Sequence, residues 1–247
     1  MNPLPAILDW LYPPTCIACR VILPLNQPAR FICARCVFLF EQITAPTCNQ
    51  CGSPVETEVP RCSSCYGKTF HFTYNRGAFP YDELIRDLMH EIKFRNKKRV
   101  AVGLGKLWAD TLAEDDSFLL HMYEHDFTLV PLPMHKAKQR ERGFNQAVVM
   151  AEELSQKLNI PMEEILLRTE DTPPQAGLHP KLRAENVRDV FAVRPDTGIR
   201  EKNYILVDDI YTTGASLNEC ARTLKNAGAN EIICITFAIT EKNNDKV

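Results

Sequence analysis

The fold of this chain is decided by residues 204–216, which read YILVDDIYTTGAS. The four apolar residues 204–207 predict a strand that is buried on both faces, as strands of parallel sheets are. Two carboxylates, Asp208 and Asp209, follow at the carboxyl end of that strand, which is where open α/β sheets bind ligands. The stretch therefore predicts a ligand site at one edge of a parallel sheet.

The loop after the two aspartates has the composition of a phosphate site. It offers backbone N–H groups and the hydroxyls of Thr212, Thr213 and Ser216, and it enters a helix whose positive end attracts anions. Without a GxxxxGK[ST] sequence it is not a P-loop, and the aspartates suit hydroxyls or Mg²⁺ instead. The alternative is that Ser216 and Glu219 form only a capping box. Because that alternative leaves the aspartates unexplained, we favour a phosphate cradle beside an acid pair.

Alternating strands and helices surround this unit. We expect strands at residues 70–79, 127–130, 165–167, 204–207 and 231–239, and helices at 82–94, 97–112, 144–158 and 216–227. Continuous apolar strands separated by helices predict an α/β fold, with a parallel sheet and helices on both of its faces.

Length and cysteine distribution predict two parts. At about 150 residues per domain, 247 residues correspond to one large domain and a small one. Eight of the ten cysteines lie between Cys16 and Cys65, so we place a zinc-binding double zinc ribbon at residues 1–66 and the α/β domain at 67–247. The other two, Cys220 and Cys234, lie in apolar segments and are expected to be buried.

The eight cysteines form four CxxC pairs, and this spacing is typical of zinc sites. Two pairs supply the four thiolates of one closed structural site, so we expect two structural zinc ions. Sequential pairing is the simplest assignment, and cross-braced pairing stays open, as do a disulfide framework and an iron–sulfur cluster. The members of the four pairs are Cys16 and Cys19, Cys33 and Cys36, Cys48 and Cys51, and Cys62 and Cys65.

Overall charge and hydropathy exclude some classes of function. The net charge of −2 gives no argument for nucleic-acid binding by the chain as a whole, so any such site must be a local patch. The sequence has no apolar run long enough for a membrane span, and its first residues lack a basic segment followed by an apolar one. We therefore expect a cytoplasmic protein.

Four segments give the chain a specific resemblance. Residues 204–216 resemble the signature of type I phosphoribosyltransferases. The cysteine-rich start and two further segments make the chain similar to the ComF family of competence-associated proteins. Those segments are VPLP at 130–133 leading to RERGFNQ at 140–146, and QAGL at 175–178 followed by Arg183, Asn186, Val187 and Phe191.

The resemblance implies a type I phosphoribosyltransferase fold that binds phosphoribosyl pyrophosphate with Mg²⁺. Asp208 and Asp209 would be the catalytic acids, holding the ribose hydroxyls and the metal, while Lys136 or Arg142 would supply charge near the pyrophosphate. Residues 169–191 would form the mobile loop that covers the substrate. The 5-phosphate would be gripped by Thr212, Thr213, Gly214, Ala215 and Ser216.

Two basic clusters are candidate sites for binding DNA. Single-strand binders combine such cations with aromatic platforms, and Phe94 lies within the first cluster; a solvated face is the alternative. The ComF resemblance implies handling of single-stranded DNA during natural transformation. The expected DNA-binding residues are Lys93, Arg95, Lys97, Lys98 and Arg99 in the first cluster and Lys138 and Arg140 in the second.

Two other functions stay open. One is a metabolic phosphoribosyltransferase acting on a nucleobase or amine acceptor, for which the sequence declares no acceptor pocket. The other is an adaptor whose zinc module docks another protein, such as another competence protein.

Overall fold

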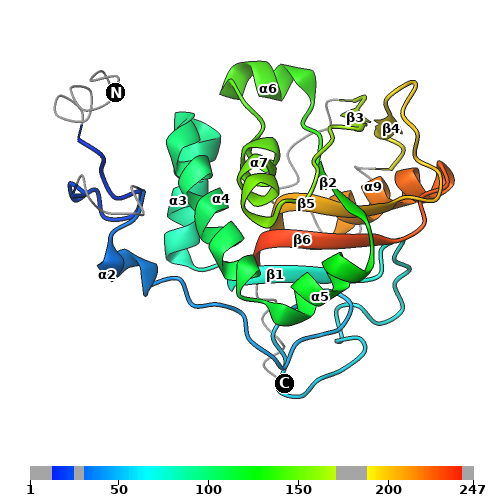
Figure 1. Cartoon of the computed structure of the whole chain (residues 1–247), viewed down its shortest axis with the longest axis horizontal. Helices are drawn as coiled ribbons and strands as arrows, with labels where there is room; N and C mark the ends of the chain where they lie inside the picture. Colours follow the sequence, from blue (N-terminus) through cyan, green and yellow to red (C-terminus); the bar gives the residue numbers. More distant parts are fainter. Residues whose placement is uncertain (1–12, 25–30, 171–187, 241–247) are drawn as a thin grey trace.

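Four parallel strands form the central sheet in the order β1-β6-β5-β2 (Figure 1). The computed structural model describes residues 13–24, 31–170 and 188–240. A separate antiparallel pair is formed by β3 and β4. The predicted α/β fold with a parallel sheet is thereby confirmed. The strands are β1 (Asn75–Pro80), β2 (Phe127–Pro131), β3 (Leu166–Arg168), β4 (Phe191–Val193), β5 (Asn203–Tyr211) and β6 (Ile232–Ile239).

Helices lie on both faces of the sheet, as predicted. Three helices, α2, α5 and α6, were not expected; α6 buries none of its residues, so it has no apolar stripe for a periodicity argument to find. In the described part of the chain, no helix combines the length and apolar character needed to cross a membrane. The helices are α2 (Ala34–Val37), α3 (Glu83–Arg95), α4 (Lys98–Ala113), α5 (Asp116–Glu124), α6 (Lys136–Arg142), α7 (Gln146–Leu158) and α9 (Ala215–Asn226).

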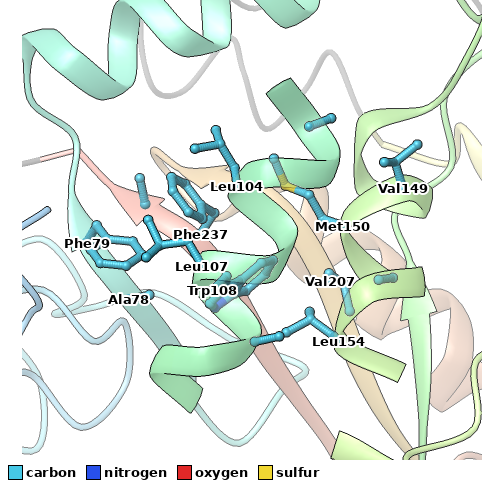
Figure 2. Close-up of a cluster of buried hydrophobic side chains, with 14 of the residues drawn as sticks. Ala78, Phe79, Leu104, Leu107, Trp108, Val149, Met150, Leu154, Val207 and Phe237 are labelled. Atoms are coloured by element: carbon cyan, nitrogen blue, oxygen red, sulfur yellow. The ribbon is translucent and has the colours of Figure 1, made fainter. Parts of the chain in front are cut away.

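Strand β5 separates two cores, because its successive side chains point to opposite faces. Ile205 and Val207 enter the core beneath α3, α4 and α7, part of which Figure 2 shows around Trp108 and Phe237. Tyr204 and Leu206 enter the core on the α9 side. Both faces of the strand are covered, which explains its uninterrupted apolar sequence.

The cysteine-rich segment contributes to both cores. Cys16 and Cys36 belong to the core beneath α4, whereas the second cysteine group packs into the core on the α9 side. Asn75, the first residue of β1, donates from Nδ2 to the carbonyl of Cys51 at 2.9 Å, and its N–H donates to the carbonyl of Gln50 at 2.9 Å. The second ribbon therefore covers the start of β1, and the predicted strand 70–79 begins only at Asn75.

Gly52 should be sensitive to substitution because it lies where the second ribbon meets β1. Its φ is +74°, and a Cβ there would stand 2.5 Å from the backbone oxygen of Asn75. We expect Gly52→Ala to lower the free energy of unfolding by about 1 to 2 kcal/mol for the left-handed backbone and roughly 2 kcal/mol more for the clash.

Gly67→Ala is the matched control for urea unfolding of the zinc-loaded protein. Its φ is +71°, with nothing within 4 Å of the added Cβ, so only the backbone cost should appear. Equal losses of stability in the two variants would contradict tight docking of the ribbon on β1.

Candidate functional site

A cavity of about 900 Å³ opens at the carboxyl edge of the sheet, and most of the predicted site residues line it. Its wall includes Asp208 and Asp209 at the end of β5, and Thr212, Gly214, Ala215 and Ser216 from the following loop and helix. Lys138 and Arg142 of α6 line it as well, whereas Lys136 and Thr213 are not among the lining residues. Residues far apart in the sequence thus converge on the edge where a ligand was expected.

The two aspartates lie side by side but have different electrostatic surroundings. The backbone N–H of Asp209 donates to Oδ1 of Asp208 at 2.9 Å, and Asp209 is only 5% exposed. Burial raises the pKa of Asp208 well above its ordinary value, and the neighbouring carboxylate of Asp209 adds to the effect. Burial acts the same way on Asp209, but the Lys93 ammonium outweighs it and holds the pKa of Asp209 below its ordinary value. Of the two carboxyl groups, Asp208 therefore has the higher pKa and Asp209 the lower.

Lys93 provides the counter-charge from α3. Its Nζ lies 2.6 Å from Oδ2 of Asp209, and its side chain is 28% exposed. Burial alone would lower the pKa of Lys93, but the carboxylate of Asp209 more than compensates and raises it. Sequence reasoning grouped Lys93 with the basic cluster, whereas the structure places it inside the cavity beside the acid pair.

The RERGFNQ segment reaches the same carboxylate. Gln146 donates from Nε2 to Oδ2 of Asp209 at 3.2 Å, and Arg142 donates from Nη1 to Oε1 of Gln146 at 2.6 Å. Asn145 caps α7 by accepting from the N–H of Ala147 at 3.1 Å, and it donates to the carbonyl of Leu132 at 2.8 Å. These bonds fix the loop after β2 against the acid pair. Sequence reasoning assigned no role to Gln146, although its place in the quoted motif was the available signal.

The loop after β5 enters α9 without a side-chain cap. Gly214 is the N-cap with a φ of +74°, and a Cβ there would lie 2.4 Å from the hydroxyl of Tyr211. The capping-box alternative is wrong, because the helix begins one residue earlier than expected and Glu219 is engaged elsewhere. Its carboxylate accepts from Nε of Arg222 at 2.9 Å and from the N–H of Asp189 at 2.7 Å.

The two basic clusters lie side by side at the rim of the cavity. The turn between α3 and α4 contacts α6, where Asn96 donates from Nδ2 to the carbonyl of Glu141 at 3.4 Å. Lys97 and Lys98 are exposed at the start of α4, and Lys136 and Arg140 are exposed on α6. Phe94 is 72% exposed, so it is not a core residue.

Other members of the first cluster have intramolecular partners. Arg95 pairs with Glu91 at 2.6 Å, and Arg99 donates from Nη2 to the carbonyl of Thr15 at 2.9 Å. Those two arginines therefore also support the fold.

The predicted covering loop, residues 169–191, lies largely outside the described residues, including Gln175, Ala176, Gly177, Leu178, Arg183, Asn186 and Val187.

The cysteines gather into two groups of four in sequential pairing. Within each group all the Sγ atoms lie within 4.8 Å of one another. The Cys19–Cys33 and Cys51–Cys62 Sγ distances are both 3.7 Å, close to the edge of about 3.8 Å of a tetrahedral zinc–thiolate site. The two groups fit two structural zinc ions, and the cross-braced alternative is wrong. Cys220 and Cys234 are fully buried, as predicted.

Comparison with known proteins agrees with both parts of the chain. Residues 145–247 match the phosphoribosyl transferase domain family, and residues 7–66 match the double zinc ribbon domain family. Competence protein F of Haemophilus influenzae is 30% identical over 88% of this chain and 93% of its own length. The chain belongs to the ComF family. Its fold is the type I phosphoribosyltransferase fold preceded by a cysteine-rich zinc ribbon region.

Two further relatives of this ComF-family chain cover most of its length. Competence protein ComFC of Bacillus subtilis is 28% identical over 83% of this chain and 82% of its own length. DNA utilization protein YhgH of Escherichia coli is 27% identical over 88% and 93% respectively. The similarity therefore extends over both the ribbons and the α/β part.

Lys93→Met should destabilise the protein, because it leaves the buried carboxylate of Asp209 without its counter-charge. We expect a loss of about 2 to 3 kcal/mol at pH 7, measured by urea unfolding. The pKa of Asp209 is lower in the folded protein than in the unfolded chain. Its ion pair with Lys93 therefore stabilises the fold fully above the unfolded-state pKa, and this stabilisation is lost as the pH falls through the folded-state pKa. The deficit of the variant should therefore shrink in acid.

Lys157→Met is the matched control. Lys157 pairs with Asp110 at 2.7 Å, a similar distance, but the two side chains are 50% and 56% exposed. Its removal should leave the free energy of unfolding nearly unchanged. Similar losses in both variants would contradict a special role for the buried pair.

Proposed function

We propose that this ComF-family protein binds phosphoribosyl pyrophosphate with Mg²⁺ at the carboxyl edge of its sheet and handles single-stranded DNA during natural transformation. One observation carries the proposal: the acid pair, the loop at the start of α9 and the cations of α3 and α6 surround one cavity. The relatives named for competence and for DNA utilization support its biological part.

The residues around the cavity fit the parts of this ligand. Ribose hydroxyls and Mg²⁺ suit the oxygens of Asp208 and Asp209, while a phosphate suits the N–H groups and hydroxyls between Thr212 and Ser216. When bound, Mg²⁺ would neutralise pyrophosphate oxygens. Arg142, at the end of α6, would attract the pyrophosphate, and Lys93 would keep Asp209 ionised.

The rim of the cavity fits a nucleic-acid strand. Lys97 and Lys98 follow the exposed Phe94 in the sequence, and the imidazole of His90 packs against the Phe94 ring at a centroid distance of 4.7 Å. Exposed cations would follow the phosphates, and the aromatic ring would stack on a base. Lys138 and Arg140 extend the same positive rim from α6.

Asp208→Asn tests the ligand proposal. Since the raised pKa of Asp208 favours its neutral form, the neutral amide should preserve the fold while removing the carboxylate that the ligand needs. We expect the affinity for Mg²⁺ and phosphoribosyl pyrophosphate to fall at least tenfold, or about 1.4 kcal/mol, in isothermal titration calorimetry. Asp126→Asn, a change at an exposed carboxylate, should bind like the parent protein.

Binding should also release a proton from Asp208. Its raised pKa means that the free protein is protonated there at higher pH than an ordinary aspartate, so the affinity should increase as the pH rises through that pKa. The heat of binding should then depend on the ionisation enthalpy of the buffer. A heat that is identical in phosphate and Tris would contradict proton release.

Single-stranded DNA binding is tested by fluorescence anisotropy with a labelled oligonucleotide at several salt concentrations. Lys97→Ala/Lys98→Ala should weaken binding and make the slope of log K against log salt shallower by about 1.4, at about 0.7 per phosphate. Phe94→Ala should cost about 1 to 3 kcal/mol with the slope unchanged.

The matched control removes two exposed lysines elsewhere, Lys106→Ala/Lys202→Ala, with the same change in net charge. Equal effects of the two double variants would mean that binding is non-specific attraction. No binding at low salt would refute the DNA proposal. A metabolic transferase would then be tested by pyrophosphate release that depends on an added nucleobase or amine.

A further inference from the structure

The amino edge of the sheet carries a second group of ligand-type side chains, at the opposite end of the strands from the cavity. His121 lies in the last turn of α5, His125 is the residue that ends it, and Glu231 immediately precedes β6. One side-chain nitrogen or oxygen of each residue lies within 4.8 Å of those of the other two. We propose that these three residues bind a zinc ion, in addition to the two cysteine sites.

One of the ligand-to-ligand distances matches that of a zinc centre. Nε2 of His121 lies 3.4 Å from Oε2 of Glu231, and zinc ligands at their usual bond lengths stand about 3.3 Å apart in a tetrahedron. Two imidazoles and one carboxylate leave the fourth position for water, as in zinc centres with an exchangeable ligand. The proposed ion thus differs in chemistry from the closed, all-thiolate sites of the ribbons.

Neighbouring groups hold the ligands in position. Thr73, just before β1, donates from Oγ1 to Oε1 of Glu231 at 3.1 Å, which leaves Oε2 directed at His121. The ring of Phe127 lies 5.4 Å from that of His121 and 6.3 Å from that of His125, and Tyr74 packs edge-on against His121 at 6.0 Å. A hydrogen-bonded carboxylate and packed imidazoles are the supports that metal sites use to orient their ligands.

The three side chains are also partly exposed, so a metal ion can reach them from the solvent. The side chains of His121 and Glu231 are 28% and 24% exposed, and His125 is exposed. The hydrogen bond between His121 and Glu231 joins only that pair, and His125 adds a second imidazole within 4.8 Å of both.

The test adds Co²⁺ to the full-length protein whose cysteine sites already hold zinc. The proposal predicts one further equivalent of bound metal, with visible d–d bands but without the near-ultraviolet thiolate charge-transfer bands of a cysteine site. Added zinc should bleach these bands, because zinc binds nitrogen and oxygen ligands at least as tightly. Metal analysis after gel filtration should then return three zinc ions per chain, two in the cysteine groups and one here.

Two variants separate this site from adventitious binding. Glu231→Gln keeps the size of the side chain and its bond to Thr73, and His125→Ala changes an exposed residue, so both should fold, as thermal unfolding without added metal will show. Each should weaken cobalt binding at least tenfold. His90→Ala, which removes an exposed histidine outside the group, should not.

Absence of d–d bands would overturn the proposal, as would cobalt binding that is unchanged in both variants or that shows only thiolate bands. None of these outcomes depends on phosphoribosyl pyrophosphate or DNA, so the metal site is tested independently of the proposed function.

Discussion

The carboxyl-terminal part of β5 has to accommodate the adjacent carboxylates of Asp208 and Asp209, and the arrangement of the cavity follows from that requirement. Two buried negative charges side by side are not sustainable without a proton or a cation. Both are favoured here: burial raises the pKa of Asp208, which favours its protonated form, and Lys93 reaches Asp209 from α3. This ion pair fixes the end of α3 against the sheet, and with Gln146 it joins the loop after β2 to the same point. The site is therefore held in shape before any ligand arrives.

The zinc ribbons contribute buried side chains to the cores of the α/β fold. Each cysteine group lies in a different core, one beneath α4 and the other on the α9 side. Loss of either metal would loosen a different core, and deletion of residues 1–66 would remove buried side chains from both. A docking role for the ribbons is therefore better examined with changes at exposed side chains, such as Phe38, which is 84% exposed.

Local patterns predicted the parts of the structure that depend on neighbouring residues. The strand and acid pair of residues 204–209 and the sequential cysteine groups follow from composition and spacing over a few tens of residues. Lys93 could not be assigned in that way, because its counter-ion is more than a hundred residues distant, and a lysine among other basic residues has the pattern of a solvated face. The capping box failed because a glycine able to adopt positive φ started α9 earlier.

The same long-range constraint explains why the histidine group escaped sequence reasoning. His121 and His125 have a helical spacing, but their third member is Glu231, which only the parallel pairing of the strands brings to the same edge. In a parallel sheet every strand begins at one edge and ends at the other, so the loops before β1, β2 and β6 meet away from the cavity. An ion held there would tie the starts of three strands together. It would stabilise the folded state by mass action while leaving the carboxyl edge, and the chemistry proposed for it, to a separate set of residues.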